Sequence, residues 1–133
     1  MRENFLHYIW KHNKVNASKL LTTDQEALQV VFVGEHNHNT GPDFLNAQIL
    51  IDEQLWAGNV EVHIKSSDWY IHRHELDKNY DNVILHVVWL HDAEVYRNDN
   101  STIPTLELKR FVNAITLSYY QKLFSKRSTW INC

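Results

Sequence analysis

One stretch of the chain, residues 83–90, restricts the fold more than any other. Its sequence, VILHVVWL, is almost continuously apolar. Such a run is typical of a central strand that is covered on both faces, as in a sheet that lies between helices. The sequence therefore predicts an α/β or α+β domain in which a mixed central sheet is flanked by helices.

Hydrophobic periodicity predicts the elements that precede this strand. Residues 3–13 carry apolar side chains at helical spacing, and the β-branched run 27–33 indicates a buried strand. Residues 44–51 and 55–65 indicate two further strands, which residues 52–54 join as a hairpin. The first part of the chain is therefore predicted to be a helix followed by three strands.

Two helices are predicted around the central strand in the second part of the chain. The polar residues 66–82 are expected to hold a short helix with Ser67 or Asp68 as its N-cap. After Pro104, an apolar stripe predicts a long amphipathic helix. The stripe consists of Leu108, Phe111, Val112, Ile115, Tyr119 and Leu123. The complete predicted order is αβββαβα, in a single domain over residues 1–133.

Composition excludes several classes of protein. The 133 residues are 44% hydrophobic and include only 3 Gly and 2 Pro, which suits one packed core and no low-complexity segment. No run approaches the ~20 apolar residues of a membrane span, so we expect no membrane protein. The net charge of −3 argues against nonspecific coating of nucleic acid. The lone Cys133 fits a reducing compartment, so we expect a cytoplasmic protein.

The strand over residues 55–65 carries the candidate functional residues. Alternation places its apolar side chains on one face and Glu61, His63 and Lys65 on the other. Titratable side chains in succession are costly to bury without partners. That face is therefore either used for chemistry or is a solvent-facing surface with a Glu–Lys pair.

Asp43, just before strand 44–51, favours the chemical interpretation. A turn at residues 52–54 sets Asp43 opposite the positions near Glu61, where opposed residues lie about 5 Å apart. The two carboxylates would form a seat for a hard divalent cation such as Mg²⁺. Lys65 or His63 would then orient or activate a water, or offset charge that develops in the transition state.

Strict alternation opposes this meeting, because matching the apolar faces of the two strands points Asp43 away from Glu61. Two arrangements would reunite the carboxylates. One is a β-bulge, for which Gly58 is the candidate, and the other places Asp43 just before the regular strand, after Pro42. The residues alone leave both open.

The segment GPDF (41–44), followed by GNVEVHIK (58–65), resembles the signature of PD-(D/E)XK nucleases, the restriction-endonuclease-like superfamily. The wider string over residues 34–92 resembles an uncharacterised bacterial family, known as a domain of unknown function, whose members tend to be longer than this chain. These resemblances imply a restriction-endonuclease-like fold, ordered helix, three strands, helix and strand, and a chain that is the N-terminal part of a longer protein.

The superfamily resemblance also implies metal-dependent hydrolysis of phosphodiester bonds in DNA or RNA. It implies that Asp43 and Glu61 hold Mg²⁺ or Mn²⁺. The position two beyond the glutamate, usually Lys, is His63 here, and Lys65 lies on the same face one step further. The superfamily often adds an acid from the first helix. The candidates for this acid are Glu3, Glu26 and Glu35.

The histidines offer a competing chemistry. The chain holds 9 of them, and two His-x-His pairs occur at residues 36–38 and 72–74. With His63 or Asp77, these pairs could form a three-ligand zinc site of the open kind that activates water.

Our favoured interpretation gives the second pair a supporting role. His72, His74 and Asp77 are expected beside the Glu61 face, where they support the metal ligands or contact phosphate. His86, in the apolar strand, is expected to be a core histidine. The leading functional hypothesis is a metal-dependent nuclease, and the alternative is a non-catalytic binding or assembly module on the same fold.

Overall fold

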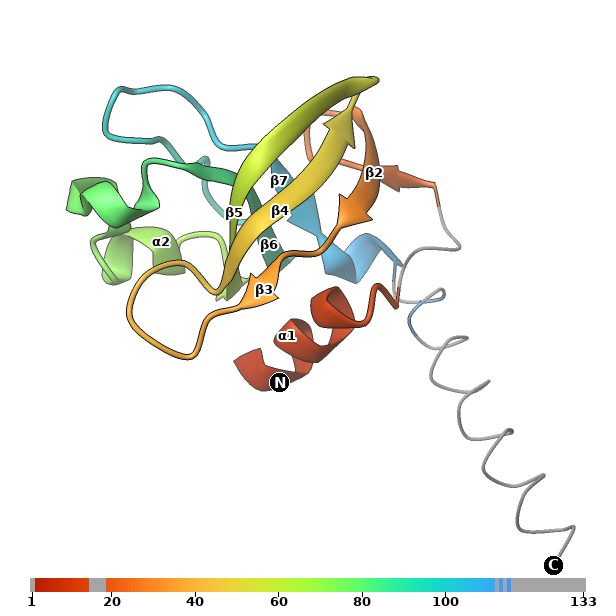
Figure 1. The fold of residues 1–133 in the computed structure, drawn as a ribbon, viewed down its shortest axis with the longest axis horizontal. Coiled ribbons are helices and arrows are strands. Elements are labelled where there is room, and N and C mark those ends of the chain that lie inside the picture. Colours follow the sequence, from red (N-terminus) through yellow and green to blue (C-terminus); the bar gives the residue numbers. More distant parts are fainter. Residues whose placement is uncertain (1, 15–18, 112, 114, 116–133) are drawn as a thin grey trace, which may run out of the picture.

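The computed structural model describes residues 2–14, 19–111, 113 and 115. In this part of the chain it shows a mixed α+β fold, in which one sheet is accompanied by two α-helices (Figure 1). The helices are α1 (Glu3–Lys11) and α2 (Asp68–Ile71). The strands are β1 (Leu20–Leu21), β2 (Ala27–Phe32), β3 (Glu35–His36), β4 (Phe44–Ile51), β5 (Gln54–Lys65), β6 (Val83–Leu90) and β7 (Thr105–Glu107). Short 3₁₀ turns are η1 (His74–Leu76), η2 (Lys78–Tyr80) and η3 (Leu108–Phe111).

The strands form a mixed sheet in the order β1-β2-β4-β5-β6-β7, and β3 pairs with β4. β4 is antiparallel to β2 and β5, whereas β6 is parallel to β5 and β7. The first six residues of β6 are all buried. The prediction of a central strand covered on both faces is therefore confirmed.

The two helices use different sides of β5. α1 buries Leu6 and Trp10 in a core that includes Val60 and Val62. α2 also packs on β5, and its Trp69 belongs to a second, smaller core. Figure 1 shows α1 below the sheet and α2 beside it. Because side chains alternate along a strand, the residues that follow Val60 and Val62 face the α2 side.

The structure departs from the predicted elements at the edges of the sheet. β3 lies between the predicted strands 27–33 and 44–51, where it pairs with the start of β4. After Pro104 the chain forms β7 along β6 and then η3, because Leu106 is buried as a strand residue beside Val87. The predicted long helix therefore does not begin there. The rest of its stripe, from Val112, lies outside the described residues except for Ile115, which is buried.

A β-bulge near the start of β4 shifts the register between β4 and β5, but the extra residue is not at Gly58. The strand register runs from Phe44 opposite Val60 to Ala47 opposite Gly58, so β4 carries one more residue than β5 in this interval. Asn46 takes up the extra residue with a left-handed φ of 58°. Gly58 has a different role, since a Cβ there would lie 2.5 Å from the Ile84 side chain on β6.

A cluster of hydrogen bonds, here called the polar clamp, follows β5, where the sequence predicts the N-cap of a short helix. Ser67 is the N-cap of α2, but its side chain makes no capping bond, and Asp68 is already the first helical residue. Ser66 Oγ donates to Asp92 Oδ1 at 3.0 Å and accepts the backbone N–H groups of Asp92 and Ala93 at 2.9 and 3.0 Å. Ser67 donates to the same carboxylate through its N–H and Oγ. The clamp ties the end of β5 to the segment after β6.

Replacement of Ser66 with alanine is expected to lower the free energy of unfolding by about 1–3 kcal/mol. Ser66 is fully buried, so its loss leaves two backbone N–H groups without their acceptor. Ser67→Ala is the matched control and is expected to cost less, since its hydroxyl bond is exposed. Urea denaturation followed by tryptophan fluorescence measures both, and equal losses would contradict the clamp.

Candidate functional site

The candidate site is built around two carboxylates that β4 and β5 bring together. Asp43 directly precedes β4, and Glu61 lies on β5. The backbone N–H of Asp43 donates to Glu61 Oε1 at 3.1 Å, and the backbone N–H of Val62 donates to Asp43 Oδ2 at 2.9 Å. Each carboxylate is thus fixed by the backbone of the other segment. The bulge and the position of Asp43 before the strand together produce the meeting that strict alternation forbids.

Burial makes this pair of carboxyl groups retain a proton. Glu61 is only 4% exposed. Burial, and then the neighbouring Asp43, raise the pKa of Glu61 from 4.5 to about 10. Burial opposes ionisation of Asp43, but hydrogen bonds with His7, Glu61 and the Val62 N–H lower its pKa to about 2. The pair therefore carries one negative charge at neutral pH, as expected where two buried carboxyl groups touch.

Helix α1 adds two groups to this pair. His7 Nε2 lies 3.4 Å from Asp43 Oδ2 and 3.6 Å from Glu3 Oε1. The proximity of Asp43, and then of Glu3, raises the pKa of His7 to about 9. Glu3, His7 and Asp43 each offer a ligand atom within 4.8 Å of the others. Of the three candidate acids, Glu3 is the one that joins this group, and Glu26 and Glu35 do not.

The sequence interpretation overlooked His7. The available signal was its position one helical turn after Glu3, on the polar side of the predicted first helix. That spacing alone does not show which strand residue the helix meets.

Three histidines gather on the other side of Glu61. His63, His72 and His74 each offer a ring nitrogen within 4.8 Å of the others. His74 Nε2 lies 2.7 Å, and His63 Nε2 3.6 Å, from Glu61 Oε2. His63 and His74 are buried, whereas His72 is exposed. The solvent-facing interpretation of this strand face is therefore wrong at Glu61 and His63, and only Lys65 is exposed.

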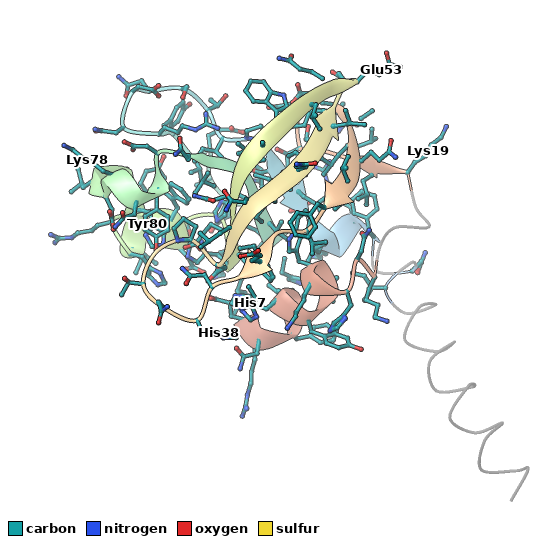
Figure 2. All side chains as sticks on the ribbon, in the orientation of Figure 1. His7, Lys19, His38, Glu53, Lys78 and Tyr80 are labelled. Atoms are coloured by element: carbon teal, nitrogen blue, oxygen red, sulfur yellow. The ribbon has the colours of Figure 1, made fainter. Side chains whose placement is uncertain are left out.

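Burial and ring contacts set the state of these histidines. Burial lowers the pKa of His63 to about 3 and that of His74 to about 4, so both are neutral at pH 7. His63 Nδ1 lies 2.7 Å from Nε2 of the fully buried His86, which directs His63 Nε2 toward Glu61. His86 is in the core, as predicted, and it also holds a member of the cluster. Tyr80, labelled in Figure 2, stacks on His74 with ring centroids 3.8 Å apart.

Two of the predicted site residues lie apart from the carboxylates. Lys65 is exposed at the end of β5, where its backbone N–H donates to Asp68 Oδ2. Asp77 is also exposed, and its carboxylate accepts the Asn79 N–H at the start of η2. For both, the predicted roles at the site stay predictions.

The other His-x-His pair lies on the α1 side of the site. The ring of His36 stacks on Phe44 at 4.8 Å and meets the ring of His7 edge-on at 5.4 Å. His38 contacts His36 with ring centroids 4.3 Å apart, and both His7 and His38 are labelled in Figure 2. The two His-x-His pairs therefore do not join in one cluster. The second pair meets His63 instead.

Comparison with known proteins identifies the family. The chain matches, over residues 3–133, the model of a family described as "Protein of unknown function (DUF2851)". The chain therefore belongs to this family, and the match extends well beyond the string 34–92 on which the resemblance to a domain of unknown function rests. No curated protein and no solved structure matches the chain. Among the described residues, no helix is long and apolar enough to cross a membrane.

Proposed function

We propose that this chain is a metal-dependent nuclease, which hydrolyses phosphodiester bonds in DNA or RNA with Mg²⁺ or Mn²⁺ held by Asp43 and Glu61. The observation that carries the proposal is the reciprocal fixing of the two carboxylates by backbone N–H groups. A protein that places a buried acid against a half-buried one, against the alternation of its strands, needs a cation or a proton to offset their repulsion.

The donor set suits a hard cation on this side of the site. Carboxylate oxygens are the ligands that Mg²⁺ and Mn²⁺ prefer, and Glu3 supplies a third acid from α1. Such a cation lowers the pKa of a bound water and stabilises charge on a phosphoryl oxygen. The superfamily resemblance implies a helix, three strands, a helix and a strand, and the longer elements α1, β2, β4, β5, α2 and β6 support the proposal when the short strands β1, β3 and β7 are set aside.

Lys65 and His63 have different roles in the proposed reaction. Lys65 is exposed on a flexible four-carbon stem, so it can approach a scissile phosphate and offset its charge. His63 is neutral and buried, so it contacts Glu61 rather than solvent. Its Nε2 lies 3.6 Å from Glu61 Oε2. We assign the charge-stabilising role to Lys65 and a water-orienting role, through Glu61, to His63.

Glu61→Gln is expected to reduce cleavage about 100-fold or more, because an amide cannot give up a proton to become an anionic ligand of the cation, while the size and burial of the side chain are preserved. Cleavage of supercoiled plasmid, and of labelled single-stranded DNA and RNA, is measured in Mg²⁺ and in Mn²⁺. Glu53→Gln, on the exposed turn between β4 and β5, is the matched control and keeps full activity. Equal cutting by wild type and Glu61→Gln would refute the assignment.

The alternative is a non-catalytic binding or assembly module on the same fold. It is favoured by one observation: the position that the superfamily usually fills with Lys holds His63, which is 1% exposed and uncharged. A folded wild type that binds the cation but cuts none of these substrates would establish this alternative.

A further inference from the structure

We propose that His63, His72 and His74, with Glu61 as a fourth ligand, form a binding site for a transition metal of the Zn²⁺ class. This site lies on the α2 side of Glu61, whereas Asp43 and Glu3 lie on the α1 side. The inference concerns metal binding alone. It shares Glu61 with the proposed nuclease centre, but it does not depend on phosphodiester hydrolysis.

The spacing of the donor atoms is close to that of a zinc site. Zinc binds His nitrogen at about 2.0–2.1 Å in tetrahedral geometry, which places neighbouring donors roughly 3.3 Å apart. The ring nitrogens of the three histidines lie within 4.8 Å of one another. Glu61 Oε2 lies 2.7 Å from His74 Nε2 and 3.6 Å from His63 Nε2, on either side of the tetrahedral value.

The direction of the His74 ring supports a common ligand rather than a hydrogen bond. His74 Nε2 is buried and close to Glu61 Oε2, yet the two atoms are not aligned as donor and acceptor. A buried ring nitrogen without an aligned partner is costly. A bound metal ion would supply the partner that this nitrogen lacks.

The surroundings hold the rings in place before any metal binds. His86 contacts the other ring nitrogen of His63, as the supporting residue of a metal-bound histidine does. Tyr80 stacks on His74, and Trp69 meets the same ring edge-on at 5.2 Å.

The donor types select the class of metal. Imidazole nitrogen suits Zn²⁺, Co²⁺ and Ni²⁺, whereas Mg²⁺ prefers oxygen ligands. Because His72 is exposed, one side of the cluster faces solvent. That exposure gives the metal a route of entry.

The test is a titration of the metal-free protein with Co²⁺, which reports tetrahedral nitrogen coordination by its visible absorption bands, followed by displacement with Zn²⁺. His72→Ala is expected to weaken binding about 100-fold or more, and because the side chain is exposed the variant should fold normally. His38→Ala, which removes an exposed histidine of the other His-x-His pair, should leave the affinity unchanged. The bands should disappear on addition of Zn²⁺.

Two results would overturn the inference. One is a wild type without the Co²⁺ bands, and the other is equal affinity in wild type and His72→Ala. A further variant separates this site from the nuclease centre: Asp43→Asn removes an acid of the α1 side and should keep the Co²⁺ bands even where cleavage is lost. Loss of cleavage with retained Co²⁺ bands would therefore support a histidine site that binds metal independently of the nuclease centre.

Discussion

Asp43→Asn is expected to abolish the stabilisation of this protein by Mg²⁺ or Mn²⁺ and to reduce metal-dependent cleavage about 1,000-fold or more. The amide keeps the size of the side chain and an oxygen that can accept the Val62 N–H, so the fold is preserved. It removes the negative charge that the carboxyl pair carries at neutral pH. A cation at 100 times its dissociation constant stabilises a native protein by about 3 kcal/mol.

Thermal unfolding with and without the cation measures the effect. Wild type should unfold at a higher temperature in Mn²⁺ than in chelator, whereas Asp43→Asn should show no difference. Asp24→Asn, an exposed acid in the turn before β2, is the matched control and should behave as wild type. An equal rise in unfolding temperature with Mn²⁺ in Asp43→Asn and in wild type would show that the carboxylate pair does not bind the cation.

The metal-free protein is expected to lose stability steeply as the pH rises above about 6.5. A group whose pKa is raised in the folded protein stabilises the fold fully at pH values below its pKa in the unfolded chain. That stabilisation is lost as the pH rises from the unfolded pKa to the folded pKa. This applies to Glu61 between 4.5 and about 10 and to His7 between 6.5 and about 9. The lowered pKa values of His63 and His74 act in the opposite sense and remove stability as the pH falls below 6.5.

Glu61→Gln isolates the largest part of this alkaline loss. Between pH 6.5 and 9, in chelator, wild type should lose up to about 1.4 kcal/mol more per pH unit than the variant, the limit for one buried group that must ionise. Chemical denaturation at each pH provides the free energies. Parallel pH profiles for the two proteins would show that Glu61 ionises freely in the native state.

The sequence predicts the central parts of this fold well because local patterns determine them. The apolar run of β6 requires cover on both faces, and the periodicity of α1 and the hairpin of β4 and β5 follow from residues that are neighbours in sequence. The strand β7 was not predicted, because Leu106 is equally apolar in a strand and in a helix. Its state is decided by pairing with Val87, a contact that no local pattern encodes.

The sequence predicts several of the residues that gather at the candidate site, but neither all of them nor their geometry. Asp43 and Glu61 follow from hairpin pairing, yet their contact depends on a bulge at Asn46, a residue that carries no distinctive motif. His7 was missed because its partner lies 36 positions away, at Asp43. His72 and His74 were recognised as a pair, but their approach to His63 depends on the path of the chain after α2.

Crystals of the metal-free protein soaked in Mn²⁺ and measured for anomalous scattering test the central claim most directly. The account predicts an anomalous peak between Asp43 and Glu61, with an oxygen of each carboxylate at roughly 2.0–2.6 Å, the range of hard cations. It also predicts that the direct contact between the two carboxyl groups is replaced by contacts with the ion. The contradicting result is a well-ordered soaked crystal in which Asp43 and Glu61 remain in contact with each other and no anomalous peak lies between them.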